Sequence, residues 1–291
     1  MTEQKRMPER VFPRAEEDAA SARSVSPSPQ TVSGAYRLAY QDEEFLLRQD
    51  LRPIRFQLEI LKPELLMEEA KIASTFVFYG SARIPEPAKA DALVDAAHTD
   101  TQRTIAERLR EKSRYYEEAR KLAQYAASTP PDRDGRRQLV VCSGGGPSIM
   151  EAANRGAHDV GAPSIGLNIV LPHEQAPNPW VTPSLSFQFH YFALRKMHFL
   201  IRARAVAVFP GGFGTFDELF ELLTLMQTGK ISVFPVLLFG RDFWDRVVNF
   251  QALVDEGVIS PNDIDLMHFV ETAEEAWAIV QDFYAEGGRK A

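Results

Sequence analysis

From residue 72 onward, short apolar runs rich in β-branched and aromatic residues alternate with longer stretches in which apolar residues recur every three to four positions. The short runs predict buried strands, and the longer stretches predict helices. An alternation of strand and helix is typical of a mostly parallel sheet covered by helices. We therefore predict an α/β domain over residues 72–288.

The expected elements follow one another in a Rossmann-like order. Strands are predicted at 75–79, 138–142, 164–170, 185–189, 205–209, 233–239 and 267–270. Helices are predicted at 101–127, 147–159, 191–203, 215–227, 241–255 and 273–284. A Pro-rich segment at 171–183 follows a strand, and its position makes it a candidate rim of a binding cleft.

The N-terminal part of the chain has a different character. Residues 1–34 are rich in Ser, Pro and charge, and they offer too little apolar area to offset the entropy of ordering them, so we predict a disordered tail. Residues 35–71 carry leucines among acids and bases and are punctuated by Pro53 and Pro63. This segment is predicted to be a helical extension of the main domain.

Composition and charge exclude several classes of protein. The 291 residues contain 33 Lys and Arg against 40 Asp and Glu, a net charge of -7, so nucleic acid is not an expected partner. No apolar run approaches the roughly 20 residues that cross a bilayer, and no secretory signal is evident, so neither a membrane nor secretion is expected. The single Cys142 fits a reducing, cytoplasmic compartment, and no spacing suggests a metal site or a cofactor.

Glycine-rich turns follow three of the predicted strands: Gly80-Ser81, Ser143-Gly144-Gly145-Gly146, and Pro210-Gly211-Gly212-Phe213-Gly214-Thr215. The carboxyl ends of parallel strands form the ligand crevice. A helix N-terminus leaves N–H groups unpaired, and glycine lets an anion approach them. These turns predict a nucleotide or sugar-phosphate site, although each turn alone could be simple turn chemistry. Their spacing matches neither the dinucleotide-binding fingerprint nor the P-loop.

Charged residues follow the third turn and also line the helix before it. Thr215 and Glu218 have the spacing of a capping box, which is the structural alternative to a catalytic role for Glu218. Glu221, one turn later, is expected to be solvated or to pair with another charge. On the preceding helix, Arg195, His198 and Arg202 share a face. A guanidinium there can contact an anion or can pair with Asp or Glu.

Taken together, Pro210-Gly211-Gly212-Phe213-Gly214-Thr215-Phe216-Asp217-Glu218, the Arg195-Lys196 pair and the triple glycine at 144–146 resemble the hallmarks of the Lonely Guy family. The resemblance covers about residues 74–284. It implies a Rossmann-like, typically homodimeric phosphoribohydrolase that splits the N-glycosidic bond of a nucleoside 5′-monophosphate. AMP or a cytokinin riboside 5′-monophosphate would be the substrate, without a cofactor, and free base and ribose 5-phosphate the products.

The resemblance also assigns roles to individual residues. Arg195 and Glu218 would be the catalytic pair. The phosphate loop would consist of Gly211, Gly212, Gly214 and Thr215, and further substrate contacts would come from Ser81, Gly144, Gly145 and Lys196. The chain departs from shorter plant-type members at Phe192-Ala193-Leu194 and after the triple glycine, where it resembles a longer bacterial branch.

Two other functions remain open from the residues. A non-catalytic nucleotide-binding module would use the same glycine turns without releasing a base. A decarboxylase dependent on pyridoxal phosphate would need a Schiff-base lysine, and Lys196 is the lysine inside the predicted site.

Overall fold

The structure, a computed structural model, describes residues 12–172 and 176–287. The chain divides into two compact units, residues 1–58 and residues 59–291. The division falls inside helix α3 (Arg52–Glu69). The boundaries predicted at residues 34 and 71 do not coincide with it.

The first unit contains short helices with few buried side chains. Its elements are α1 (Ala15–Arg23), α2 (Glu43–Leu46), the beginning of α3, and 3-10 helices at Gly34–Tyr36, Ala39–Gln41 and Gln49–Leu51. Part of the tail predicted to be disordered is therefore helical in the structure. Acidic residues in the first turn of α1 and Arg23 in its last turn complement the helix dipole, which explains the helix locally. Residues 1–11 of the predicted tail lie outside the described residues.

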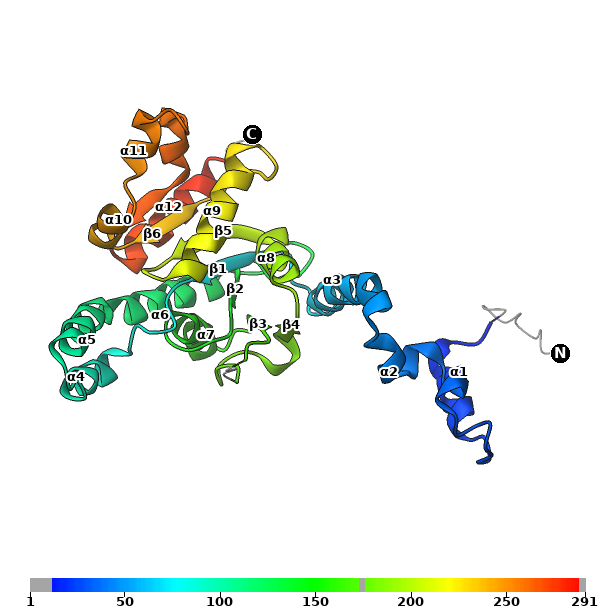
Figure 1. The fold of residues 1–291 in the computed structure, drawn as a ribbon. Helices are drawn as coiled ribbons and strands as arrows, with labels where there is room; N and C mark the ends of the chain where they lie inside the picture. The colour runs from blue at the N-terminus through cyan, green and yellow to red at the C-terminus, as the bar shows by residue number, and fades with distance from the viewer. Residues whose placement is uncertain (1–11, 173–175, 288–291) are drawn as a thin grey trace. The chain divides into compact units, whose positions relative to one another are not determined.

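The second unit is built on one seven-stranded sheet (Figure 1). Its strands are β1 (Thr75–Tyr79), β2 (Val140–Ser143), β3 (Ser164–Ile169), β4 (Ser186–Phe189), β5 (Ala203–Val208), β6 (Val236–Phe239) and β7 (His268–Val270). They lie in the order β4-β3-β2-β1-β5-β6-β7, and every pairing is parallel. The predicted α/β, Rossmann-like fold is confirmed.

Helices cover both faces of this sheet (Figure 1). They are α4 (Pro87–Asp95), α5 (Asp100–Lys112), α6 (Arg114–Ala127), α7 (Ile149–Asp159), α8 (Phe192–Ile201), α9 (Phe213–Gln227), α10 (Arg241–Val247), α11 (Phe250–Asp255) and α12 (Ala273–Ala285), with 3-10 helices at Pro183–Leu185 and Pro261–Leu266. One core packs α6, α7 and α12 on the sheet, and the other packs α8 and α9. Within the described residues, no helix is long and apolar enough to span a bilayer.

The seven predicted strands are all present, with ends shifted by up to three residues. The predicted helix at 101–127 is interrupted at Ser113, whose hydroxyl donates to the Arg110 carbonyl at 2.7 Å. The predicted helix at 241–255 is divided because Asn249 caps a new helix, its side chain accepting from the Ala252 N–H at 3.0 Å. Helix α4, which starts at Pro87, was not predicted.

Candidate active site

The three glycine-rich turns lie at the same edge of the sheet because β1 is placed between β2 and β5. The Ser81 N–H donates to the Pro210 carbonyl at 3.1 Å, which joins the turn after β1 to the turn after β5. The Ser81 hydroxyl accepts from the Arg83 N–H at 3.0 Å and so stabilises its own turn. The carboxyl ends of the central strands therefore meet in one place, as the parallel topology requires.

Helix α9 begins without the predicted capping box. Its N-cap is Gly212, which offers no side-chain cap, and Thr215 lies inside the first turn. The capping interpretation of Thr215 and Glu218 is therefore wrong. Thr215 is instead buried against Gly211, where an added Cβ would come 2.1 Å from the Thr215 Oγ1 atom. Gly211 thus lets the loop close onto the helix.

The first turn of α9 has the features of an anion site. A Cβ added at Gly212 or at Gly214 would meet no atom within 4 Å, so the backbone is open on that side. The N–H groups at the start of a helix have no partner within the helix and carry a partial positive charge. These groups are available to a phosphate at the mouth of the loop.

Arg195 of α8 and Glu218 of α9 are brought together at this edge. The Arg195 Nη1 atom lies 3.8 Å from Glu218 Oε1, and the two side chains are 12% and 14% exposed. At this separation the charges attract each other, but no direct hydrogen bond joins them. Both groups therefore keep hydrogen-bonding capacity for a ligand.

The position of the Arg195 guanidinium is fixed by its surroundings. Its Nε atom donates to the carbonyl oxygen of Leu167, in β3, over 2.7 Å. Its Cζ atom lies 5.2 Å from the centre of the Phe199 ring. A Cβ added at Gly144 would come 2.5 Å from Arg195 Nη2. Gly144 is therefore needed to leave room for the guanidinium.

Burial is the main cause of the pKa shifts of both side chains. It raises the pKa of Glu218 to about 7, against the opposing effect of the positive charge on Arg195. Burial also lowers the pKa of Arg195, and the charge of Glu218 opposes that shift. The phenol of Tyr79, at the end of β1, has a pKa raised first by burial and then by the negative charge of Glu218. Tyr79 thus remains a neutral donor beside the pair, and sequence analysis did not identify it.

Buried asparagines, also missed from the sequence, shape the triple-glycine turn. Gly145 has a φ of +72°, and a Cβ added there would come 2.5 Å from the Asn168 side-chain oxygen. Asn178 donates from its backbone N–H to the Gly145 carbonyl at 2.8 Å and from its side chain to the Gly146 carbonyl at 2.9 Å. Asn178 belongs to the Pro-rich segment predicted to line a cleft, so that segment packs on this turn. Residues 173–175 of the segment lie outside the described residues.

Lys196 differs from the other predicted site residues. Its Nζ atom lies 3.1 Å from Asp217 Oδ1 and 2.9 Å from Glu221 Oε2. These hydrogen bonds, of which the one with Glu221 is the stronger, raise the pKa of Lys196. The expectation that Glu221 pairs with another charge is confirmed. Lys196 lines a groove between α8 and α9 that contains neither Arg195 nor the glycine turns.

His198 of α8 and Arg202, which follows the end of α8, have structural partners. Arg202 donates from Nη2 to Glu64 Oε2 at 2.9 Å. His198 is buried, and its Nε2 atom lies 3.1 Å from the Glu59 carbonyl oxygen. For Arg202 the structural alternative, pairing with an acid, is therefore confirmed.

Among residues 12–172 and 176–287, no group of three or more His, Cys, Asp and Glu is arranged to hold a metal ion. Cys142 is buried at the sheet, and burial raises the pKa of its thiol. This cysteine is therefore a protonated core residue.

The raised pKa of Glu218 predicts that the free energy of unfolding depends on pH through this residue. Its pKa is about 7 in the folded protein and ordinarily 4.5, so the folded state holds a proton that the unfolded chain releases between these values. The contribution of Glu218 to stability therefore falls as the pH rises from 4.5 to 7. Relative to wild type, Glu218→Gln should gain up to about 3 kcal/mol in unfolding free energy across this range. Urea unfolding of both proteins at several pH values measures this, and parallel pH curves would contradict it.

Comparison with known proteins adds to this geometry. The family model described as "Possible lysine decarboxylase" matches residues 150–280. The chain is 31% identical over 153 residues to cytokinin riboside 5′-monophosphate phosphoribohydrolase LOG2 of Arabidopsis thaliana, covering 51% of this chain and 67% of that protein. It is 29% identical over 168 residues to the pyrimidine/purine nucleotide 5′-monophosphate nucleosidase of Escherichia coli strain K12, covering 54% of this chain and 34% of that protein.

Among solved structures, the molybdenum cofactor carrier protein of Chlamydomonas reinhardtii is similar with a TM-score of 0.41 and 18% identity, over 73% of this chain and 99% of that one. The sequence matches are the stronger findings, and the residues matched by the family model, 150–280, include the helix with the Arg-Lys pair and the Pro-Gly-Gly loop. On this evidence the chain belongs to the Lonely Guy (LOG) family.

Proposed function

We propose that this protein is a phosphoribohydrolase that cleaves the N-glycosidic bond of a nucleoside 5′-monophosphate, with AMP or a cytokinin riboside 5′-monophosphate as substrate. The observation that carries the proposal is the largely buried Arg195–Glu218 pair beside the open N-terminus of α9. The names of the plant and bacterial relatives support the same reaction. The products are the free base and ribose 5-phosphate.

The phosphate binds at the start of α9 in this proposal. Gly211, Gly212, Gly214 and Thr215 form the loop, and the unpaired N–H groups together with the helix dipole attract the anion. The phosphate is remote from the bond that breaks. Its binding energy therefore serves to hold the ribose in a fixed position against the catalytic pair.

Glu218 acts on the sugar. As the C1′–N bond breaks, the ribose gains positive charge, and an ionised carboxylate next to it lowers the energy of that state. Water adds to C1′, and the base leaves with the electron pair of the broken bond and takes up a proton. A pKa of about 7 means that the charged form of Glu218 is available near neutral pH, and that this carboxylate can also accept the proton of the water.

Arg195 acts on the leaving base. The base accumulates negative charge as it departs, and the fixed guanidinium offsets this charge in a buried setting where electrostatic interactions are strong. Even with its pKa lowered by burial, a guanidinium is a poor proton donor. We therefore assign Arg195 an electrostatic role. Ser81, Gly144 and Gly145 line the same edge and are assigned to substrate contact.

Decarboxylation through a Schiff base is disfavoured by the state of Lys196. A lysine must lose its proton to attack an aldehyde carbon. Lys196 instead has two carboxylates within 3.1 Å, and its pKa is raised. We therefore do not assign Lys196 a covalent role, and its predicted contact with substrate rests on the family resemblance alone.

We further propose that the protein is a cytoplasmic homodimer. Apolar side chains are exposed on neighbouring helices: Met197 is 43% and Ile201 40% exposed on α8, and Phe220 is 37% exposed on α9. These residues border two adjoining grooves between the helices. An exposed apolar patch of this kind marks an interaction surface, and a second copy of the chain carries the matching patch.

The first prediction concerns the 5′-phosphate. Because the phosphate supplies positioning energy, we expect kcat/KM for AMP to exceed that for adenosine by at least about 100-fold. Chromatographic detection of free adenine and ribose 5-phosphate measures both reactions. Tight binding of AMP with no release of base would instead identify a non-catalytic binding module.

The second prediction concerns the catalytic pair. Glu218→Gln and Arg195→Ala should each lower kcat for AMP by about 100- to 1000-fold, because each removes one group that stabilises the transition state. Asp217→Asn is the matched control on α9, since it removes a charge one position away and leaves Glu221 to pair with Lys196. Wild-type rates in both variants of the pair would show that the site is elsewhere.

The third prediction concerns the subunit interface. Met197→Glu places a charge in the exposed apolar patch and should convert a dimer into a monomer at micromolar concentration. Ile105→Glu is the control, because Ile105 is 54% exposed on α5, outside this patch. Sedimentation equilibrium measures the mass of both variants. A dimer that persists in Met197→Glu would place the interface on another surface.

A further inference from the structure

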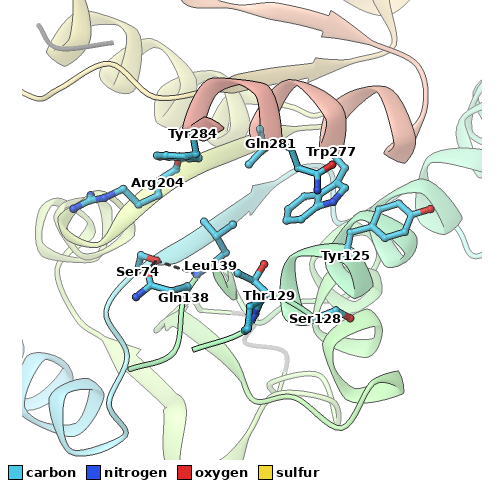
Figure 2. A pocket seen from close by; sticks show the side chains of 12 residues that line it. Ser74, Tyr125, Ser128, Thr129, Gln138, Leu139, Arg204, Trp277, Gln281 and Tyr284 are labelled. Atoms are coloured by element: carbon cyan, nitrogen blue, oxygen red, sulfur yellow. Dashed lines mark hydrogen bonds between the residues drawn. The ribbon is translucent and has the colours of Figure 1, made fainter. Parts of the chain in front are cut away.

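A cavity of about 630 Å³ lies at the edge of the sheet opposite to the glycine turns (Figure 2). Ser74, Leu139 and Arg204 line it from the amino ends of β1, β2 and β5. The C-terminal parts of α6 and α12 form its other walls. It is separated from the proposed catalytic site by the full length of the central strands, and its volume is typical of small-molecule sites.

Three aromatic side chains line this cavity. The Trp277 ring of α12 stacks on the Tyr125 ring of α6, with centroids 6.3 Å apart and an interplanar angle of 28°. Tyr284 donates from its hydroxyl to the Arg204 carbonyl at 2.6 Å, which fixes a third ring at the rim. Figure 2 shows Trp277 and Leu139 facing the space between α12 and the strand ends. Such surfaces favour a flat, apolar ring system.

Leu139, in one wall of the cavity, has a backbone conformation that residues other than glycine rarely adopt. Leu139 has a φ of +49°, in the left-handed region. Its N–H donates to the Ser74 hydroxyl oxygen at 2.9 Å, and that hydroxyl in turn donates to the Gln138 side chain at 2.8 Å. Backbone strain of this kind persists only where the surrounding structure fixes it, and it is concentrated at functional sites.

Most of the side chains that line the cavity are uncharged. Among the described residues that line it, Arg204 is the only charged one, and its guanidinium donates to the Ala203 carbonyl at 2.8 Å. Helix α6 ends at Ala127, so its C-terminal carbonyls, with their partial negative charge, lie next to the cavity. The cavity therefore combines aromatic rings with a guanidinium and helix-end carbonyl groups, which suits a ring with a hydrogen-bonding edge.

We propose that this cavity is a second ligand site, which binds a neutral planar heteroaromatic compound of the size of a purine base. The free base released by the proposed reaction is such a compound, so the site is a product-binding site if that function holds.

The experiment separates this cavity from the catalytic site. Glu218→Gln, which turns over AMP slowly, is saturated with AMP so that the catalytic site is occupied, and adenine is then titrated in by calorimetry. We expect one adenine bound per chain under these conditions. Absence of adenine binding while the catalytic site is filled would overturn the proposal.

Two cavity variants in the same background locate the bound adenine. Ser128→Trp fills the cavity from an exposed position on its rim, and Trp277→Ala removes the central ring. Each should weaken adenine binding at least tenfold, whereas Trp277→Phe retains a ring and should restore most of it. Ile105→Trp, an exposed position on α5, is the matched control. Adenine binding that both Ser128→Trp and Trp277→Ala leave unchanged would place the ligand elsewhere.

The outcome is distinguishable from failure of the proposed function. A protein that keeps Glu218 and carries only Ser128→Trp or Trp277→Ala should still release adenine from AMP, because neither residue lies at the catalytic edge. If AMP is cleaved but no second adenine binds, only the cavity proposal fails. If adenine binds in the cavity but no AMP is cleaved, only the phosphoribohydrolase proposal fails.

Discussion

The burial of a carboxylate beside a guanidinium is the interaction on which the candidate site depends. Removing both charges from water is costly, and their attraction offsets that cost only in part, so the fold must hold them in place. The cost is visible in Glu218, whose pKa is raised to about 7 even though Arg195 Nη1 lies 3.8 Å from its Oε1 atom. A pair placed in this way, without a direct hydrogen bond, keeps hydrogen-bonding capacity and is not optimised for stability.

The sheet topology explains how these groups come together. β1 lies at the centre, and the chain continues to β2 on one side and later to β5 on the other, which is a topological switch point. Arg195 reaches this point from α8, and Glu218 reaches it from α9. Small residues make the approach possible, because a side chain at Gly144 would collide with the guanidinium and one at Gly211 with Thr215. The glycines therefore serve both the packing of the site and access to it.

Much of the fold and part of the site could be predicted from the sequence. The central strands were predictable because they are mostly continuous buried apolar runs, such as Thr75–Tyr79. The outer strands β4 and β7 are only partly buried. Local hydrogen bonds were harder to predict from the sequence. The apolar pattern continues through Ser113, although the helix is interrupted there. Thr215 has the spacing of a capping residue but lies inside α9. The two motifs predicted that Arg195 and Glu218 act together, and the structure places Arg195 Nη1 3.8 Å from Glu218 Oε1.

The parts of the site that could not be predicted come from distant segments. Tyr79 resembles any other buried aromatic residue of a strand, and only the structure shows that burial and then the charge of Glu218 raise the pKa of its phenol. Asn178 lies in a segment whose sequence predicts only a loop, yet it bonds the backbone of the triple-glycine turn. The Arg-Lys pair carries two adjacent cations, but the helix directs only Arg195 to Glu218, while Lys196 contacts Asp217 and Glu221. One residue along a helix is a rotation of about 100°, which a motif alone does not interpret.

The two edges of a parallel sheet covered by helices differ in polarity for a general reason. Each helix that follows a strand starts at the carboxyl edge and ends at the amino edge, so N–H groups gather at one edge and carbonyl groups at the other. In this protein the carboxyl edge carries the open start of α9 together with the Arg195–Glu218 pair. The amino edge carries the end of α6, aromatic rings and a cavity. The alignment of the helix dipoles therefore favours an anion at the carboxyl edge and gives the amino edge no such preference, before any specific side chain acts.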